Sequence, residues 1–250
     1  MVGEQPDVEK NRRAAMLTLR EDLKEKYDAQ YNDEGEEWRR IGAIGKAQNI
    51  IDVTADLAFD SVIEIGAGNG AILEILAEKQ IAKRFTALEI SSSAIKQIEK
   101  KEIPNLVQVA QFDGYDLAFD DDSFDLAICS HVVEHVEFPR KLMREIKRIS
   151  KRQVFEVPID FSFHVDRKFE HFNAYGHINI YTPGLFNFLL YTEGFEVIRS
   201  LSRLYPIEVL KFQHKKISLN YISQITKRVV WKAIPWLMKA KPNTYSVLTK

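Results

Sequence analysis

The sequence predicts an α/β fold in which a doubly wound, mostly parallel sheet carries helices on both of its faces. A short β-branched strand at residues 62–65 runs directly into a G-x-G-x-G turn at 66–70, and an apolar helical segment follows. Apolar strand-like runs then alternate with charged helical runs as far as residue 201, which is the pattern of consecutive βαβ units. With 250 residues, 45% apolar and 28% charged, the chain is large enough for one domain with a substantial core.

The composition narrows the class of protein. The single cysteine, Cys129, excludes an internal disulfide framework. No segment approaches the roughly 18 apolar residues of a membrane span, and no apolar signal segment follows Met1. We therefore expect a cytoplasmic protein.

The formal net charge of −1 hides an asymmetry along the chain. Nine basic residues and no acidic residue follow Glu208. Subtracting these nine from the 35 basic residues leaves 26 basic and 36 acidic side chains in residues 1–208. This contrast marks the C-terminal segment as a candidate contact surface.

Residues 1–58 are expected to form N-terminal helices. Apolar positions at helical spacing predict an exposed helix around residues 16–27, after a charged leader. The stretch 38–57, WRRIGAIGKAQNIIDVTADL, predicts one or two more helices with isoleucines facing inward. These helices either pack in front of the first strand or form a lid over a bound cofactor.

The second strand is expected at residues 84–90, and it ends in an acidic residue. Glu89 lies nineteen residues after Gly70, close to the position at which a carboxylate accepts hydrogen bonds from ribose hydroxyls. A solvated glutamate at a strand end is the alternative. A charged helix, capped by serines, is predicted at 91–101.

The third and fourth strands are expected at residues 106–110 and 124–130. Asp113 follows the third strand, at the carboxyl edge of the sheet where open α/β folds bind ligands. The fourth strand is apolar enough to lie in the middle of the sheet.

The segment QFDGYDLAFDDDSFDLAICSHVVEHVEFP, residues 111–139, resembles the type 11 family of class I S-adenosylmethionine (SAM) methyltransferases. The family's pattern has an acidic turn, a Ser-Phe-Asp strand and a Leu/Val-Glu-His helix start, and its glycine turn reads like residues 64–70. The resemblance extends over residues 38–200. It implies SAM as the cofactor and a seven-stranded, mostly parallel Rossmann-like methyltransferase sheet with an antiparallel last strand.

The resemblance also implies a set of cofactor-binding residues. The glycine turn and its preceding acid would hold the methionine part of SAM, Glu89 the ribose, and Asp113 with the Gly114 backbone the adenine amino group. Ser130 and His131 would line the methionine pocket. The complete set is Glu64, Gly66, Ala67, Gly68, Gly70, Glu89, Ile90, Asp113, Gly114, Ser130 and His131.

A fifth strand at 152–157 opens into a loop, 159–183, that is expected to form the acceptor pocket. Its aromatic residues favour an apolar pocket, and His164, His171 and His177 suggest metal ligation. The spacings of these histidines match no compact ligand signature, so we expect no metal. Residues 176–183 resemble a Gly-His-x-x-x-Tyr/Phe-Thr segment of the family, with Thr182 capping a helix that runs to Thr192.

The core is therefore expected at 59–203, with a sixth strand at 195–201. A basic helical insertion would span 204–241, and 242–250 would supply the last strand. The insertion carries tryptophans beside lysines, which indicates peripheral membrane attachment or a homodimer contact. Packing of its apolar face on the domain is the alternative.

We expect a SAM-dependent methyltransferase that acts on a small molecule or glycan, most readily at oxygen. A base is then needed, and the candidates are His131, His135 and His177, with His177 favoured. A non-catalytic SAM-binding scaffold or partner-binding protein is the alternative from another class, and an NAD-linked enzyme is a weaker one. No nucleic-acid acceptor is expected, because the Asn-Pro-Pro-aromatic signature of base methylation is missing.

Overall fold

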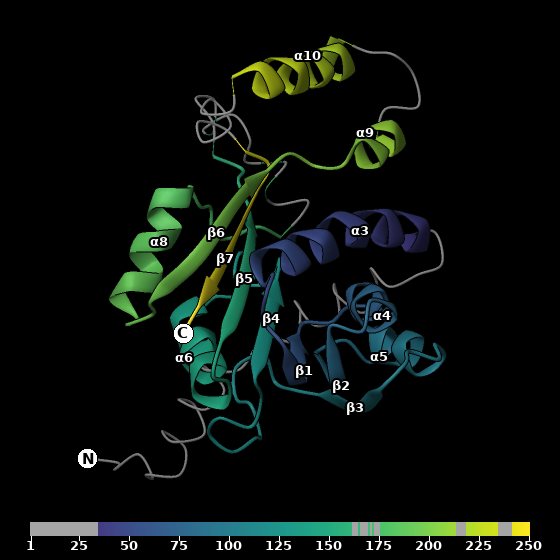
Figure 1. Ribbon diagram of the computed structural model, residues 1–250, viewed down its shortest axis with the longest axis vertical. Coiled ribbons are helices and arrows are strands. Elements are labelled where there is room, and N and C mark those ends of the chain that lie inside the picture. The colour runs from purple at the N-terminus through teal and green to yellow at the C-terminus, as the bar shows by residue number, and fades with distance from the viewer. Residues whose placement is uncertain are drawn as a thin grey trace, which may run out of the picture.

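The computed structural model describes residues 35–161, 165, 170, 172, 176–213, 219–234 and 242–250. Its centre is a seven-stranded sheet with the strand order β3-β2-β1-β4-β5-β7-β6 (Figure 1). The strands are β1 (Phe59–Ile65), β2 (Ala82–Glu89), β3 (Leu106–Gln111), β4 (Leu126–Ser130), β5 (Gln153–Pro158), β6 (Val197–Arg203) and β7 (Thr244–Thr249). The helix expected around residues 16–27 lies outside the described residues.

The sheet is parallel except at one strand. The pairs β1–β2, β1–β4, β2–β3 and β4–β5 are parallel, whereas β7 runs antiparallel between β5 and β6. The prediction of a mostly parallel seven-stranded sheet with an antiparallel last strand is confirmed. β4 is buried along its whole length, as expected for a strand in the middle of the sheet.

Two apolar cores lie on opposite faces of the sheet, because successive side chains of a strand point to opposite sides. On β1, Ile63 and Ile65 belong to one core and Val62 to the other. The first core receives side chains from α6 (Pro139–Ile149) and α8 (Pro183–Thr192). The second receives side chains from α3 (Glu36–Val53), α4 (Ala71–Glu78) and α5 (Ser92–Glu99).

Local capping explains where two of these helices begin. The Ser91 hydroxyl accepts a hydrogen bond from the Ala94 N–H at 3.1 Å and starts α5. The Thr182 hydroxyl accepts from the Leu185 N–H at 3.1 Å, and Pro183 occupies the first position of α8. Both caps agree with the sequence prediction.

The start of α6 differs from the prediction. Residues Val133 to His135 were expected to begin this helix, but they form a turn, and α6 starts at Pro139. The Ile178 and Asn179 N–H groups donate to the Glu134 carbonyl, and the Asn179 amide donates to the carbonyls of Val133 and Val136. The carbonyls that a helix would have used are therefore bound by a neighbouring loop.

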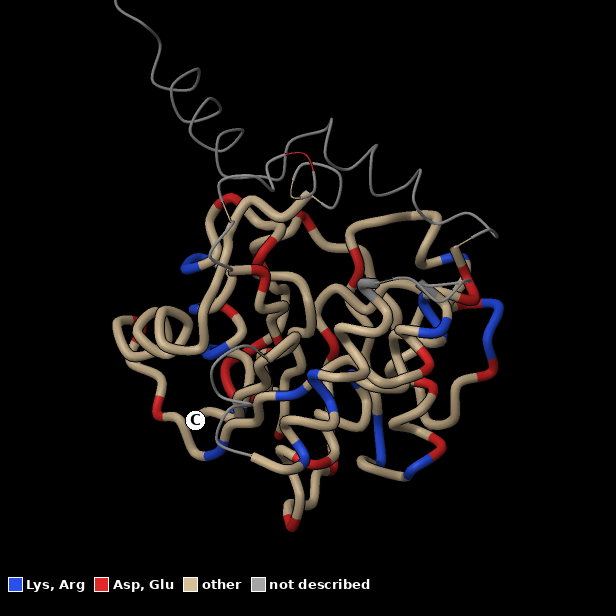
Figure 2. The backbone as a smooth tube through the Cα atoms, turned by 90° about the horizontal axis from the view of Figure 1, so that it is seen from above, with Lys and Arg blue, Asp and Glu red and all other residues tan. Residues whose placement is uncertain are grey.

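Two further helices, α9 (Ile207–Gln213) and α10 (Leu219–Ala233), follow β6 and precede β7 along the chain. α9 packs beside α3, where Phe212 stacks on Trp38 with ring centroids 5.6 Å apart. α10 lies farther from the sheet (Figure 1), and Ile222, Val229 and Val230 on it are exposed. Within the described ranges no helix has the length and apolar character needed to cross a membrane. Acidic and basic residues are interspersed over the described part of the molecule (Figure 2).

Candidate active site

A cavity of about 640 Å³ opens at the carboxyl ends of the central strands. Its walls come from one face of α3, the glycine turn after β1, the ends of β4 and β5, and residues 203–209 after β6. Such a volume lies within the roughly 300–1,000 Å³ of small-molecule sites. α3 contributes both to the core and to the cavity. Its side chains Ala47, Ile50 and Val53 are buried in the core, whereas Lys46 and Asn49 line the cavity.

The glycine turn forms one wall of the cavity. Gly66, Gly68 and Gly70 all have positive φ, at 71°, 57° and 75°. A Cβ atom on Gly66 would lie 2.5 Å from Cγ2 of Val132, so no larger residue fits this close approach without a shift. The turn thus presents bare backbone to the cavity.

Glu89 holds this turn in place. Its Oε2 accepts a hydrogen bond from the Gly68 N–H at 2.7 Å, while Oε1 accepts from the N–H groups of Ile90 and Ser91 at 2.8 and 2.9 Å. The side chain is buried at the end of β2. The carboxylate therefore fixes the position of the turn directly.

Two buried polar side chains at neighbouring strand ends have unsatisfied atoms. Within the described part of the chain, Oε2 of Glu64 and Oγ of Ser130 have no hydrogen-bond partner. Burial raises the pKa of Glu64 well above its usual value, although Lys46 acts in the opposite direction. Burial likewise lowers the pKa of Lys46, against the attraction of Glu156, Glu134 and Glu64. Atoms of this kind suit a ligand that brings its own donors.

A hydrogen-bonded network joins the end of β4 to β5 and α3. His131 has a positive φ of 56°, a conformation that is rare for residues other than glycine. Its Nε2 lies 3.2 Å from Oε1 of Glu156. Oε2 of Glu156 accepts from Asn49 at 2.9 Å and from the Ser246 hydroxyl at 2.6 Å. Burial and Lys46 act to lower the pKa of His131, but Glu134 and Glu156 raise it above its usual value.

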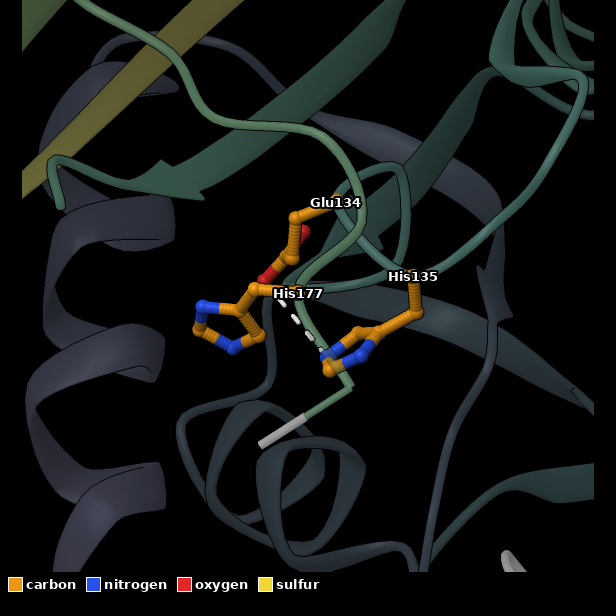
Figure 3. Close-up of side chains that lie close together, drawn as sticks. All are labelled: Glu134, His135 and His177. Atoms are coloured by element: carbon orange, nitrogen blue, oxygen red, sulfur yellow. Dashed lines mark ion pairs between the residues drawn. The ribbon is translucent and has the colours of Figure 1, made fainter. Parts of the chain in front are cut away.

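Two more histidines meet a buried acid beside this network (Figure 3). Nε2 of His135 lies 3.8 Å from Oε1 of Glu134, and the rings of His135 and His177 have centroids 4.8 Å apart. Nδ1 of His135 donates to the Gly176 carbonyl at 3.1 Å, and Nδ1 of His177 lies 2.6 Å from Oδ2 of Asp160. Burial lowers the pKa of His135, which keeps this ring neutral near pH 7.

The structure brings part of the predicted site together at this cavity. Gly66, Gly68, Ser130, His131, His135 and His177 line it. The other predicted cofactor residues lie outside the lining that the described residues form: Glu64, Ala67, Gly70, Glu89, Ile90, Asp113 and Gly114.

Asp113 is occupied by local contacts, because its Oδ1 accepts from the N–H groups of Tyr115 and Asp116, both at 2.8 Å. Of the predicted aromatic pocket, Phe161 is largely exposed and Phe172 is buried, and neither lines the cavity. His164 and His171 lie outside the described residues.

Four residues at or beside the cavity were not assigned from the sequence: Lys46, Glu134, Glu156 and Asp160. Glu156 did carry a signal, since it stands inside the otherwise apolar strand QVFEVP in the way that Glu64 stands inside VIEI. Glu134 and His135 were part of the family pattern, but the expected helix hid the turn that brings them to His177. Lys46 and Asp160 gave no signal in the sequence.

Residues 63–155 match the type 11 methyltransferase family model, described as "Methyltransferase domain". The chain is 29% identical over 92 residues to "Putative methyltransferase YrhH" of Bacillus subtilis, a match that covers 36% of this chain and 51% of that protein. It is also 29% identical over 104 residues to the ubiquinone biosynthesis O-methyltransferase of Pseudomonas syringae, a match that covers 41% of this chain and 45% of that protein. The chain thus spans about half the length of the curated relatives it matches.

Solved structures share the fold over a larger part of the chain. A Haloferax volcanii protein described as "the putative methyltransferase", solved in complex with the Trm112 methyltransferase activator, matches with a TM-score of 0.66 at 17% identity. The match covers 89% of this chain and 96% of that one. Other matching chains, which are 15% and 22% identical, are described as SAM-dependent methyltransferases and share the fold. SAM is the cofactor that the family match implies.

The cavity and the strand ends beside it offer groups that suit the methionine end of SAM. The glycine turn leaves room for close backbone contact, and the unsatisfied Glu64 and Ser130 atoms lie at adjacent strand ends. An α-ammonium group would supply donors for such oxygens, and Lys46 would supply positive charge for the α-carboxylate. The chemistry of the available groups therefore matches the group that the family implies.

Proposed function

Because the chain carries a class I SAM-dependent methyltransferase domain of the type 11 family, we propose that the protein transfers a methyl group to an oxygen atom of a small molecule or glycan. The observation that carries this proposal is the shared cavity. It has the glycine turn on one wall and the His135–His177 pair on another. A donor and an acceptor can therefore meet in one enclosure.

The cofactor residues have distinct tasks in this proposal. The glycine turn and Ser130 hold the methionine part, with Glu64 accepting from its ammonium group. Glu89 accepts from the ribose hydroxyls while it fixes the Gly68 N–H, and Asp113 with Gly114 and Ile90 borders the adenine. When SAM is bound, it supplies a methyl group on a sulfonium leaving group, so orientation provides most of the catalysis.

The acceptor enters from the side of α3 and the segment after β6. Trp38, Leu204, Tyr205, Pro206 and Val209 give this part of the cavity an apolar wall. An apolar wall with a few polar groups opposite suits a ring or a sugar face. Residues 36–53 then act as part of a lid as well as a packing helix.

His177 is proposed as the base for an oxygen acceptor. The Asp160 carboxylate accepts the Nδ1 hydrogen of His177, which leaves Nε2 as the ring atom that can take a proton. Nε2 of His177 would accept the proton of the acceptor hydroxyl. SAM, when bound, would supply the methyl group to the acceptor oxygen and would leave as a neutral thioether, so atoms and charge balance.

Labelled SAM tests the proposal. The protein, incubated with methyl-labelled SAM and fractions of a small-molecule extract, is expected to transfer label to an acceptor, and calorimetry is expected to show SAM binding. His177→Ala should lower turnover by about 10²–10⁴-fold with unchanged SAM affinity. Binding of SAM without label transfer to any fraction would favour the non-catalytic scaffold instead.

The remaining assignments are also proposals. The chain is placed in the cytoplasm, with 59–203 as the catalytic core and 204–241 as a basic insertion that contacts a membrane surface or a second copy of the chain. The exposed apolar residues of α10 support this contact. Trp231 is instead buried, and Lys227 lies with its Nζ 4.2 Å from the centre of that ring, so this pair favours packing on the domain.

A further inference from the structure

Glu134 is a fully buried carboxylate with unusual surroundings. Its side chain is 0% exposed, and neither carboxylate oxygen accepts a hydrogen bond from any residue in the described part of the chain. The nearest ring nitrogens are Nδ1 of His131 at 3.4 Å and Nε2 of His135 at 3.8 Å, both from Oε1. A buried carboxylate is costly unless a donor or a cation compensates its charge. The ion pair with His131 compensates part of this charge, but both carboxylate oxygens lack a hydrogen bond, and a positively charged ligand would fit beside them.

Two histidines complete a set of ligand atoms around this carboxylate. One ligand atom from each of Glu134, His135 and His177 lies within 4.8 Å of the others (Figure 3). Metal bonds of about 2.0–2.2 Å place neighbouring ligand atoms roughly 3–3.5 Å apart. Closing the site around an ion requires movements on the order of 1 Å, which side-chain rotation can supply.

The partners of the two rings orient them for coordination. A carbonyl oxygen can only accept, so Nδ1 of His135 carries the hydrogen in its bond to Gly176, and the lone pair lies on Nε2. The carboxylate of Asp160 sets the same tautomer in His177. Histidine ligands characteristically donate their other ring hydrogen to a carbonyl or carboxylate in this way.

We propose that Glu134, His135 and His177 bind one divalent first-row transition-metal ion at the wall of the cavity. Two imidazoles and one carboxylate favour Zn²⁺, Fe²⁺, Co²⁺ or Mn²⁺ over Mg²⁺, which prefers oxygen ligands. Three protein ligands leave coordination positions open, as in catalytic metal sites. The set differs from the histidine group considered in the sequence, with which it shares only His177.

The role of the ion rests on the proposed function, whereas the site itself rests on geometry. An acceptor hydroxyl that coordinates the ion has a lowered pKa and loses its proton to water near neutral pH. In the metal-loaded protein His177 is a ligand and cannot also take the proton, so the ion replaces it as the agent that makes the acceptor oxygen nucleophilic. The base role proposed above for His177 then applies to the metal-free protein. An acceptor with two adjacent oxygens, such as a catechol or a sugar diol, could fill two open positions.

Cobalt binding tests the site without reference to activity. The full chain, stripped with a chelator, is titrated with Co²⁺ and followed by visible absorption and calorimetry, with thermal unfolding of each variant as the folding control. We expect one Co²⁺ per wild-type chain and a tenfold to hundredfold weaker affinity in Asp160→Asn, which keeps all three ligands. Glu134→Gln and His135→Ala should bind more weakly still, and Glu78→Gln, an exposed control on α4, should match the wild type.

The outcomes separate the site from its role. Absence of Co²⁺ binding by the stripped wild-type chain, or equal affinity in folded Glu134→Gln, would overturn the site. SAM affinity should be the same in stripped and Co²⁺-loaded protein. Methyl transfer that continues at full rate in chelator would overturn the role of the ion, and Co²⁺ binding with no methyl transfer at all would overturn the proposed function but leave the site standing.

Discussion

Replacing Glu89 with alanine removes one carboxylate that accepts three backbone hydrogen bonds, from Gly68, Ile90 and Ser91. With a net contribution of about 1 kcal/mol per bond, the variant should lose roughly 2–3 kcal/mol of unfolding free energy. For a chain of this size that corresponds to a fall in Tm of about 4–12 °C. Calorimetric unfolding measures this loss, and Glu99→Ala, an exposed position on α5, is the matched control.

The same substitution should weaken SAM binding. Loss of a charge-assisted acceptor to the ribose costs about 1.5–3 kcal/mol, or roughly tenfold to a hundredfold in affinity. Because Glu89 also holds the Gly68 N–H, an indirect loss through the turn must be separated from a direct one. Titrating wild type and variant with SAM and with an analogue that lacks the 2′-hydroxyl gives a double-mutant cycle.

The double-mutant cycle distinguishes direct contact between Glu89 and the ribose from an indirect effect through the glycine turn. If Glu89 contacts the hydroxyl directly, removing both partners should cost less than the sum of the two single losses. Strictly additive losses would show that Glu89 acts only through the turn. SAM affinity that is unchanged in the alanine variant would refute the ribose assignment altogether.

Three further outcomes are expected. Gly66 has a positive φ, and a Cβ added there would lie 2.5 Å from Val132, so Gly66→Ala should lose about 1–3 kcal/mol of unfolding free energy and bind SAM more weakly. A variant with unchanged stability and activity would show that the turn adapts. Lys151 and two backbone N–H groups lower the pKa of Asp125 to about 2, so its stabilisation is complete above about pH 4 and disappears as the pH falls toward 2. In denaturant unfolding at pH 7, Asp125→Asn should therefore have an unfolding free energy about 1–2 kcal/mol below that of the wild type. This difference should shrink as the pH falls toward 2. A difference that is the same at both pH values would contradict the ion pair. If α10 meets a membrane, anionic vesicles should sediment the protein at low salt and release it at high salt, since each basic residue contributes about 1 kcal/mol; protein that stays in the supernatant at every salt concentration would favour packing of this segment.

The sheet could be predicted because its determinants are local. Apolar strands of five to eight residues, a glycine turn and serine or threonine caps each specify their own element, and the order of the elements then restricts the topology. The positions of Glu64 and Glu89 near the ends of β1 and β2 could be predicted for the same reason, whereas their roles toward a cofactor remain proposals. The expected and observed ends of the strands differ by up to two residues, except that β1 begins three residues earlier than expected, at Phe59.

The polar part of the site could not be predicted in the same way. The pairing of His177 with Asp160 and the closeness of His135 depend on how a long loop returns to the sheet. The turn at Glu134 depends on donors from Ile178 and Asn179, more than 40 residues later. No local pattern encodes such contacts, so the sequence prediction of a helix start was wrong and the grouping of these side chains was not foreseen.

The network around Glu156 has a consequence for the order in which the molecule folds. One carboxylate accepts hydrogen bonds from Asn49 and Ser246, which are 107 and 90 residues away along the chain. Contacts of such high separation form late, because the loops between them must close first. The βαβ units at residues 59–130 can assemble from neighbouring segments, but the floor of the cavity exists only after β7 has entered the sheet between β5 and β6. Cofactor binding during refolding should therefore lag behind the appearance of secondary structure, and a ligand added early should not accelerate the first phase.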